Sequence, residues 1–186
     1  MVRRIFSILL SLFVLMISSV AFANFYSVKD SGWINMRNQN TFVFEATGEP
    51  LKIKIKKDIW SNDKMFLQAH YKKEKIYDEP MRYVSSNRIE EICDKASGHI
   101  LYIVSIGNDA QYIMGYDRTN KKWQTYAFNN DFYSPFGINT YSQNFSLKNG
   151  ELELSCYEPS QNQHYVYRFF WDSNANWIGY TCLGMR

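Results

Sequence analysis

The sequence predicts an all-β fold, mainly antiparallel sheet in a sandwich or barrel-like arrangement, on three observations. Apolar and polar residues alternate over several short segments, which is the period of a half-buried strand. Tyr and Phe, which favour pleated surfaces, are frequent: the 186 residues include 14 Tyr and 13 Phe but only 9 Gly and 4 Pro. Asn149-Gly150 is a strong hairpin-turn signal between two alternating segments.

The expected strands follow one another with mostly polar gaps between them. The clearest is Leu51 to Lys56, whose residues are alternately apolar and cationic. Strands are predicted at residues 51–56, 64–71, 98–106, 111–116, 122–128, 151–157, 164–171 and 177–183. Ser86 to Ala96 is the one segment with a helical start, because Ser or Asn precedes Glu90 and Glu91, and it predicts one short helix.

The first 23 residues have the three parts of a secretory signal peptide. Arg3 and Arg4 precede an apolar run that ends at Ile17, and Ala21-Phe22-Ala23 supplies small residues before a cleavage site. The run is too short to span a bilayer comfortably. Asn24 follows the site, so no cysteine is available there for lipid attachment. We expect export, cleavage after Ala23 and a single β-rich domain of residues 24–186 in the periplasm or outside the cell, with no membrane attachment.

The charge of the mature chain argues against nucleic acid as a partner. The whole chain has a formal charge of +3, and Arg3 and Arg4 leave with the signal peptide. The remaining balance is close to neutral, whereas nucleic-acid binders usually carry a strong basic excess.

Three cysteines remain after cleavage, namely Cys93, Cys156 and Cys182. Disulfides persist outside the cytoplasm, and an odd number leaves one thiol over. Cys156 and Cys182 are expected on opposite sides of the strand at 164–171, about 10 Å apart, which exceeds the roughly 7 Å Cα limit for a disulfide. Any intramolecular bridge is therefore expected to include Cys93, and the alternative is three free thiols.

Two stretches resemble known patterns. Tyr112 to Trp123, an aromatic strand with an Asp-to-Asn turn and a following Trp, resembles a single kelch-type propeller motif and is echoed by Tyr167 to Trp177. No run of repeats at a fixed period follows, so we attribute the echo to similar hairpin chemistry. Lys148 to Cys182 resembles a C-terminal hairpin of small exported bacterial β-proteins of unassigned function. That resemblance implies strands and no activity.

No catalytic, cofactor or metal motif is present in the sequence. His70, His99 and His164 lack the spacing of a zinc site. There is no nucleophile elbow and no phosphate-binding glycine loop. A Cys93–His99 nucleophile pair and a pair of carboxylates for glycoside cleavage remain alternatives. We therefore predict no catalytic residues, no cofactor and no metal.

Residues 127–145 are the most unusual stretch, because six aromatic residues occur among Asn, Ser, Asp and Gly without regular periodicity. Rigid rings beside small polar residues are typical of binding loops. The predicted binding residues are Asp131, Tyr133, Phe136, Asn139 and Tyr141, with Phe128 and Phe145 buried at the base of the loop. The alternative is a loop that packs on its own rings.

These observations favour an exported, non-enzymatic binding protein. The expected partner is a protein, for example a toxin or hydrolase that attacks the cell wall, which the chain would block as an inhibitor or immunity protein. The alternative is a secreted glycan-binding or glycan-cleaving protein that uses the same aromatic loop.

Overall fold

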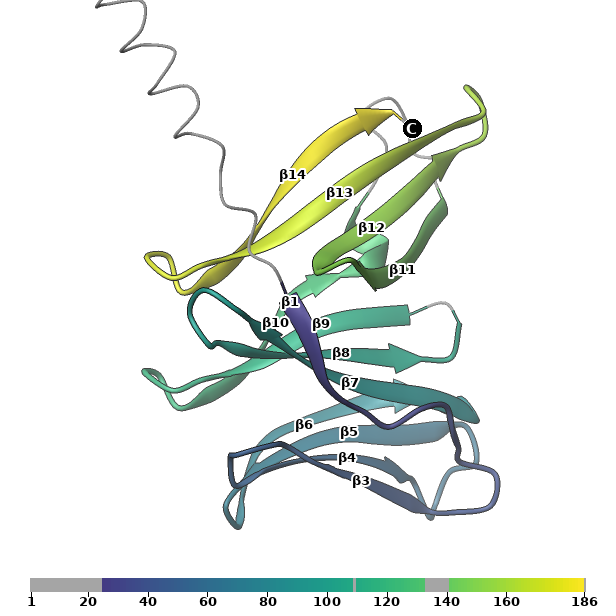
Figure 1. Ribbon diagram of the computed structural model, residues 1–186. Helices are drawn as coiled ribbons and strands as arrows, with labels where there is room; N and C mark the ends of the chain where they lie inside the picture. The colour runs from purple at the N-terminus through teal and green to yellow at the C-terminus, as the bar shows by residue number, and fades with distance from the viewer. Residues whose placement is uncertain (1–24, 109, 133–140, 186) are drawn as a thin grey trace, which may run out of the picture.

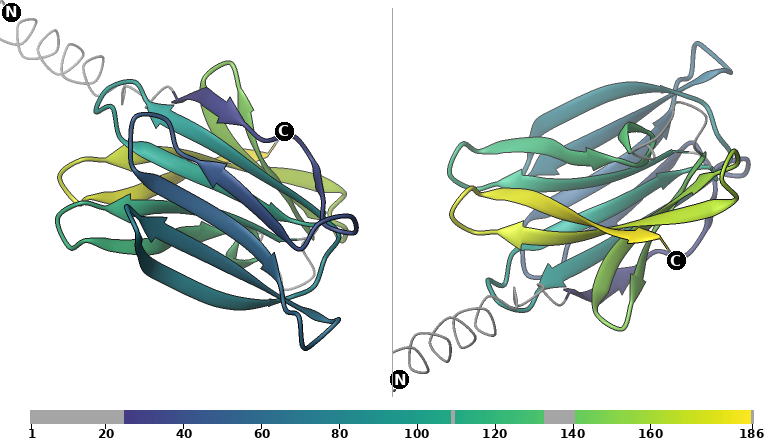
Figure 2. Two further views of the ribbon diagram at one scale, coloured as in Figure 1. Left: turned by 90° about the horizontal axis from the view of Figure 1, so that it is seen from below. Right: turned by 90° about the horizontal axis from the view of Figure 1, so that it is seen from above.

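The computed structural model describes residues 25–108, 110–132 and 141–185, with the side chains of 141–143 and 185 left undescribed. Three antiparallel sheets, each containing a meander of four consecutive strands, stack face to face (Figures 1 and 2). The predicted all-β antiparallel class is confirmed, and none of the sheets formed by these residues closes into a barrel. The predicted signal peptide, residues 1–23, lies outside the described residues.

The first sheet lies at the bottom of Figure 1. It contains the strand predicted at 51–56, which is confirmed as β4. Its order is β3-β4-β5-β6. Leu51, Ile53 and Ile55 are buried in the core, and the lysines between them face away from it. The strands are β3 (Thr41–Glu45), β4 (Leu51–Lys57), β5 (Lys64–Tyr71) and β6 (Glu74–Arg82).

The middle sheet is covered on both faces. Its order is β1-β7-β8-β9-β10, and the short β2 also pairs with β7. Along β8, Tyr102 and Val104 belong to the core shared with the first sheet, and Leu101 and Ile103 to the core shared with the third. The strands are β1 (Phe25–Asp30), β2 (Ile34–Asn35), β7 (Ser86–Asp94), β8 (Ile100–Ile106), β9 (Ala110–Asp117) and β10 (Lys122–Phe128).

The third sheet, at the top of Figure 1, has the order β11-β12-β13-β14. Asn149 and Gly150 form the two-residue turn between β11 and β12, with φ of 53° and 84°, as the Asn-Gly signal predicts. The strands are β11 (Tyr141–Lys148), β12 (Glu151–Glu158), β13 (Gln163–Asp172) and β14 (Trp177–Met185).

The helix predicted near residues 86–96 is wrong, because Ser86–Asp94 is strand β7. This strand lies between β1 and β8 and pairs with both. Ile89 and Ile92 are fully buried, and Glu91 is buried as well instead of serving a helix start. Burial between two sheets therefore outweighs the local helix-start signal.

The strand predicted at 122–128 is confirmed as β10, whereas the long loop predicted at 127–145 ends earlier than expected. A 3-10 turn η1 (Asn129–Asp131) follows β10, and β11 begins at Tyr141. A register shift between Ser142 and Phe145 interrupts the alternation that would have marked β11. Phe145 is buried as expected, whereas Phe128 is half-buried and stacks on Tyr112, with ring centroids 4.6 Å apart.

All three cysteines are free, so the free-thiol alternative holds. Cys156 lies opposite Tyr165 and Cys182 opposite Tyr167, which places them on either side of β13 as predicted. Cys93 and Cys156 are buried, and burial raises the pKa of the Cys156 thiol to about 11. Cys182 is exposed.

Four hairpins share one turn design, which explains the internal echo in the sequence. In each, an acidic residue at the end of a strand accepts a hydrogen bond from a backbone N–H group of the turn. The fourth residue after this acid has a positive φ. The acids are Asp94, Asp117, Glu158 and Asp172. The residues of positive φ are Gly98, Lys121, Asn162 and Asn176. Trp123 lies one residue farther from Asp117 than Trp177 lies from Asp172, so the two tryptophans occupy different positions in their hairpins.

Candidate functional site

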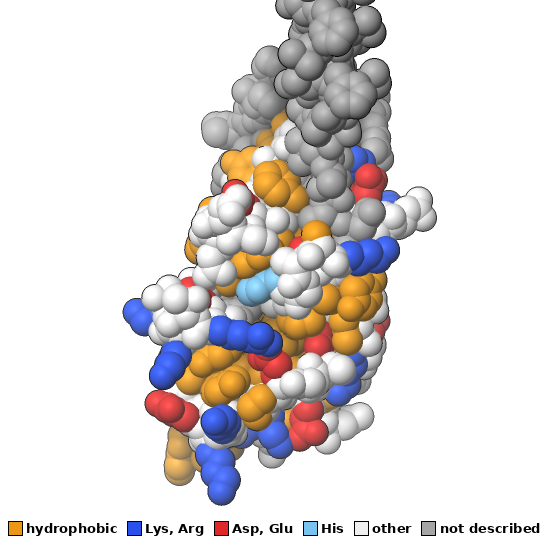
Figure 3. Space-filling view, turned by 60° about the vertical axis from the view of Figure 1, so that its left-hand side comes forward, with side chains coloured by type: hydrophobic (Ala, Val, Ile, Leu, Met, Phe, Trp, Pro, Cys, Tyr) orange, Lys and Arg blue, Asp and Glu red, His pale blue; other side chains and the backbone are white. Residues whose placement is uncertain are grey.

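The candidate sites lie at two opposite ends of the stacked sheets. Strand β4 runs between them: Glu49 precedes its first residue at one end, and Ile59 and Trp60 follow its last residue at the other. The Glu49 end, on the left of Figure 1, also carries the β7–β8, β9–β10 and β13–β14 turns. Figure 3 shows this end, with Lys and Arg side chains gathered around apolar surface.

The Trp60 loop, residues 58–63 between β4 and β5, exposes two adjacent large apolar side chains. Trp60 is 90% exposed and Ile59 is 69% exposed. Single exposed apolar residues are ordinary on protein surfaces, but two neighbours at the tip of a hairpin form a patch that interaction sites typically use.

Hydrogen bonds fix the shape of the Trp60 loop. The backbone N–H of Trp60 donates to the Asp58 carboxylate at 3.0 Å, and the N–H of Asp58 donates to the carbonyl of Lys64 at 3.1 Å. The N–H of Tyr83, beyond the end of β6, donates to the carbonyl of Asp63 at 2.7 Å. The Ser61 hydroxyl donates to the Asp63 carboxylate and lowers the pKa of that group. The exposed side chains of Ile59 and Trp60 are therefore presented on a constrained backbone.

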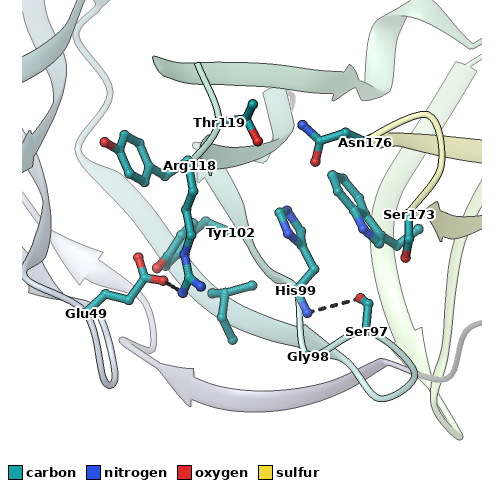
Figure 4. A pocket seen from close by; sticks show the side chains of 12 residues that line it. Glu49, Ser97, Gly98, His99, Tyr102, Arg118, Thr119, Ser173 and Asn176 are labelled. Atoms are coloured by element: carbon teal, nitrogen blue, oxygen red, sulfur yellow. Dashed lines mark hydrogen bonds and ion pairs between the residues drawn. The ribbon is translucent and has the colours of Figure 1, made fainter. Parts of the chain in front are cut away.

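The His99 cleft lies at the opposite end and encloses about 280 Å³. All three sheets contribute to it (Figure 4). The first sheet supplies Glu49 from its β3–β4 loop, and the middle sheet supplies most of the floor. The lining residues are Glu49, Ser97, Gly98, His99, Ile100, Tyr102, Tyr116, Arg118, Thr119, Trp171, Ser173 and Asn176.

Stacking and an ion pair hold the walls of the His99 cleft together. The His99 ring stacks on Trp171 of β13, with centroids 3.6 Å apart and planes at 7°. Arg118 pairs with Glu49, which ties the β9–β10 turn to the first sheet (Figure 4). Asn120 and Asn176 donate to the buried Asp117 carboxylate and lower its pKa, which joins the β9–β10 and β13–β14 turns.

Two buried polar atoms of the His99 cleft have no hydrogen-bond partner among the described residues, namely the Tyr102 hydroxyl and His99 Nε2. Tyr102 is only 1% exposed, and burial raises the pKa of its hydroxyl. Burial also lowers the pKa of His99, against the weaker opposing effect of Asp94 and Asp117. His99 is therefore neutral at pH 7, with one ring nitrogen as a donor and the other as an acceptor.

A second hollow of about 700 Å³, the lysine hollow, adjoins the His99 cleft. Tyr116 and Arg118 line both. Within the described chain, the lysines of the hollow form no ion pair. The lysine hollow is lined by Tyr71, Lys72, Lys73, Glu74, Ile76, Tyr116, Arg118 and Lys121.

Of the sequence-predicted binding residues, only Asp131 has a described side chain. Asp131 is exposed on the 3-10 turn, whereas Tyr133, Phe136 and Asn139 lie outside the described residues. Tyr141 pairs with Tyr157 at the start of β11, and its side chain is not described. Phe132, at the described start of the loop, packs inward against Phe145, Phe169, Tyr167 and Tyr180.

Sequence reasoning missed Ile59 and Trp60. The available signal was two large apolar residues in a short gap bounded by Asp58 and Asp63, between two strongly alternating strands. It missed the His99 cleft because that cleft is formed by residues far apart in the chain, for which no local pattern exists.

The part of the chain that is described contains neither a cluster of metal-ligating side chains nor a membrane-spanning helix. Its residues include no group of three or more His, Cys, Asp or Glu side chains placed to hold a metal ion. The three histidines lie on different sheets: His70 on β5, His99 before β8 and His164 on β13. No helix formed by these residues is long and apolar enough to span a bilayer.

Comparisons with known proteins add no relative: no family model, curated protein or solved structure matches the chain.

Proposed function

We propose that this chain is an exported, non-enzymatic binding protein that recognises a protein partner through the Trp60 loop. The partner class is a toxin or hydrolase that acts on the cell wall, and the chain acts as its inhibitor or immunity protein. Export is supported by the sequence of residues 1–23. The absence of a catalytic motif from the sequence supports a binding role over catalysis.

The observation that carries this proposal is the exposure of Ile59 and Trp60 side by side. Tryptophan is among the residues that contribute most to binding energy in protein interfaces. A Trp side chain buries about 200 Å² on binding, and at roughly 25 cal/mol per Å² this is worth about 5 kcal/mol before the costs of association. An energy of that size makes Trp60 a suitable anchor in a cleft of a partner.

The fixed backbone of the Trp60 loop supports the same role. Association costs free energy when a flexible loop must be ordered, and a loop that is already constrained avoids part of that cost. The hydrogen bonds of Asp58 and Asp63 provide this constraint. Lys57 and Lys64 flank the loop, so charged groups surround the apolar tip, as is typical of the rim of an interface.

An inhibition assay tests the partner class. Purified mature protein is added to a muramidase, an amidase and an endopeptidase, each digesting peptidoglycan, and the rate of lysis is followed by turbidity. We expect the wild type to inhibit at least one of these enzymes. Ile59→Asp should abolish that inhibition, because it places a charge in an apolar contact.

Val43→Asp is the matched control for Ile59→Asp. Val43 is 40% exposed on the outer face of β3, away from the Trp60 loop, and the same charge there should leave inhibition unchanged. Inhibition lost equally in both variants, or retained in Ile59→Asp, would contradict the role of the loop. If no hydrolase is inhibited, the inhibitor role is rejected.

A second candidate function is glycan binding, which a groove between β6 and the middle sheet favours. The groove encloses about 680 Å³ and is lined by Tyr77, Tyr83 and Tyr112 together with Glu79. Tyr112 stacks on Phe128, at the described start of the predicted aromatic loop. Retarded migration in gels containing soluble glycan, lost in Tyr83→Ala, would support this candidate over the first.

A further inference from the structure

The His99 cleft combines a half-open cavity with buried polar groups that lack partners among the described residues. A buried hydroxyl without a hydrogen bond costs about 1–3 kcal/mol, so its retention calls for a ligand or an ordered water. Tyr102 is 1% exposed, and it and His99 both line the cleft. The two orphaned atoms are buried, so a molecule in the cavity reaches them after a small displacement of these side chains.

We propose that the His99 cleft binds one unit of an acidic saccharide, with the sugar ring in the cavity and its carboxylate directed toward the lysine hollow. This site is distinct from the Trp60 loop and lies at the other end of β4.

The cavity suits a single hydroxyl-bearing ring. Its volume of about 280 Å³ lies just below the range of roughly 300–1,000 Å³ for ligand sites, which excludes an extended ligand from the inner part. Its polar groups are mixed: the Tyr102 hydroxyl donates or accepts, and the neutral His99 ring carries one donor and one acceptor. Ser173 and Thr119 add hydroxyls at the wall. Hydroxyl groups, which also donate and accept, match this mixture better than an apolar or purely anionic ligand.

The surrounding charge favours an acidic group on that ring. Lys72, Lys73, Arg118 and Lys121 line the lysine hollow, against the carboxylates of Glu74 and of Glu49, the ion-pair partner of Arg118. Arg118 is 74% exposed, and one nitrogen of its guanidinium pairs with Glu49. The other N–H groups of the guanidinium remain as donors for a second carboxylate. Because Arg118 lines both hollows, it stands where the sugar would meet its acidic substituent.

Titration calorimetry with two matched pairs of sugars tests the proposal. The pairs are N-acetylmuramic acid with N-acetylglucosamine, and glucuronic acid with glucose; acetate serves as a carboxylate without a ring. We expect the acid of at least one pair to bind about tenfold more tightly than its neutral partner and than acetate. Equal binding of the two members, equal binding of acetate, or no heat from any sugar at millimolar concentration would overturn the proposal.

Two variants of the cleft and two controls outside it show whether the sugar binds there. Tyr102→Phe removes only the orphaned hydroxyl, so we expect the sugar acid to bind about tenfold more weakly with no fall in melting temperature. Arg118→Gln should remove the preference for the acid over its neutral partner. Lys64→Gln, which removes an exposed cation at the other end of the molecule, should change neither. Unchanged affinity in Tyr102→Phe and Arg118→Gln would place any sugar binding elsewhere. Trp60→Ala should bind the sugar like the wild type, so failure of either proposal is distinguishable from failure of the other.

Discussion

The ring of His99 packs between two sheets by stacking on aromatic neighbours. Its ring lies on Trp171 at 3.6 Å and meets Tyr126 edge to face at 6.5 Å. No partner of Nε2 exists among the described residues. The resulting loss of solvation penalises the charged imidazolium, which is why the pKa of His99 is lowered.

The lowered pKa of His99 predicts a loss of stability in mild acid. Below pH 6.5 the unfolded chain binds a proton at this position and the folded chain resists it, so the free energy of unfolding falls as the pH drops from 7 to 5. His99→Phe keeps a flat ring and has no group that titrates at this position, so its free energy of unfolding should fall less between pH 7 and pH 5. Melting temperatures of both proteins at pH 7, 6 and 5 measure the difference. A difference between the two that does not change with pH would contradict the assignment.

At the scale of the element, four turns of one design connect the strands, and three of them line the His99 cleft. The fourth residue of each turn has a positive φ, which costs an ordinary side chain about 1–2 kcal/mol. Gly98 meets this requirement without strain, and Asn162 and Asn176 are favoured alternatives. Lys121, with φ of 52°, is the least suited of the four.

Lys121→Gly should therefore stabilise the protein, by about 0.5–1 kcal/mol, because glycine adopts this conformation without a steric penalty. The adjacent Lys122→Gly is the matched comparison. Lys122 lies in β10, where glycine should cost a similar amount. Urea unfolding of the three proteins gives the free energies. Lower stability of Lys121→Gly than of wild type would show that the lysine side chain, rather than the backbone, determines stability at this turn.

The elements that the sequence predicted correctly include those with one buried face or a distinctive turn. Strand β4 and the Asn149-Gly150 turn are examples, since alternation and turn chemistry are local properties. Strand β7 was mistaken for a helix because Ser or Asn ahead of Glu90 and Glu91 gives a local helix-start signal, which burial between two sheets outweighs. The bulge in β11 hid its strand period. The His99 cleft could not be predicted, because it depends on how the three sheets stack.

At the scale of the whole molecule, the middle sheet is shared by two hydrophobic cores. Ile53 and Met65 of the first sheet pack with Val104 of β8, and Leu154 and Phe169 of the third sheet pack with Ile103 of the same strand. Because one strand contributes to both cores, loss of either core should destabilise the other.

Ile53→Ala and Leu154→Ala test this coupling. Each removes a fully buried side chain and should cost about 2–5 kcal/mol. The two substitutions lie in different cores, yet each should lower the midpoint of a single, cooperative unfolding transition. Two separate transitions by calorimetry, only one of which shifts in each variant, would show that the sheets unfold independently.

The two candidate sites are far apart on the molecule. The Trp60 loop and the His99 cleft lie at opposite ends of β4, which at about 3.3 Å per residue spans roughly 20 Å. The proposed protein partner and the proposed saccharide would therefore bind at separate ends, without competing for the same surface.

The dissociation constant of the complex formed by Trp60→Ala with its protein partner, measured beside that of the wild type, tests the proposed function most directly. Removal of a central anchor should cost about 2 kcal/mol, roughly a thirtyfold weaker complex. The melting temperature should stay that of the wild type, because a side chain that is 90% exposed contributes little to folding. An unchanged dissociation constant would contradict the binding role of the loop, and so would weaker binding accompanied by a strongly lowered melting temperature.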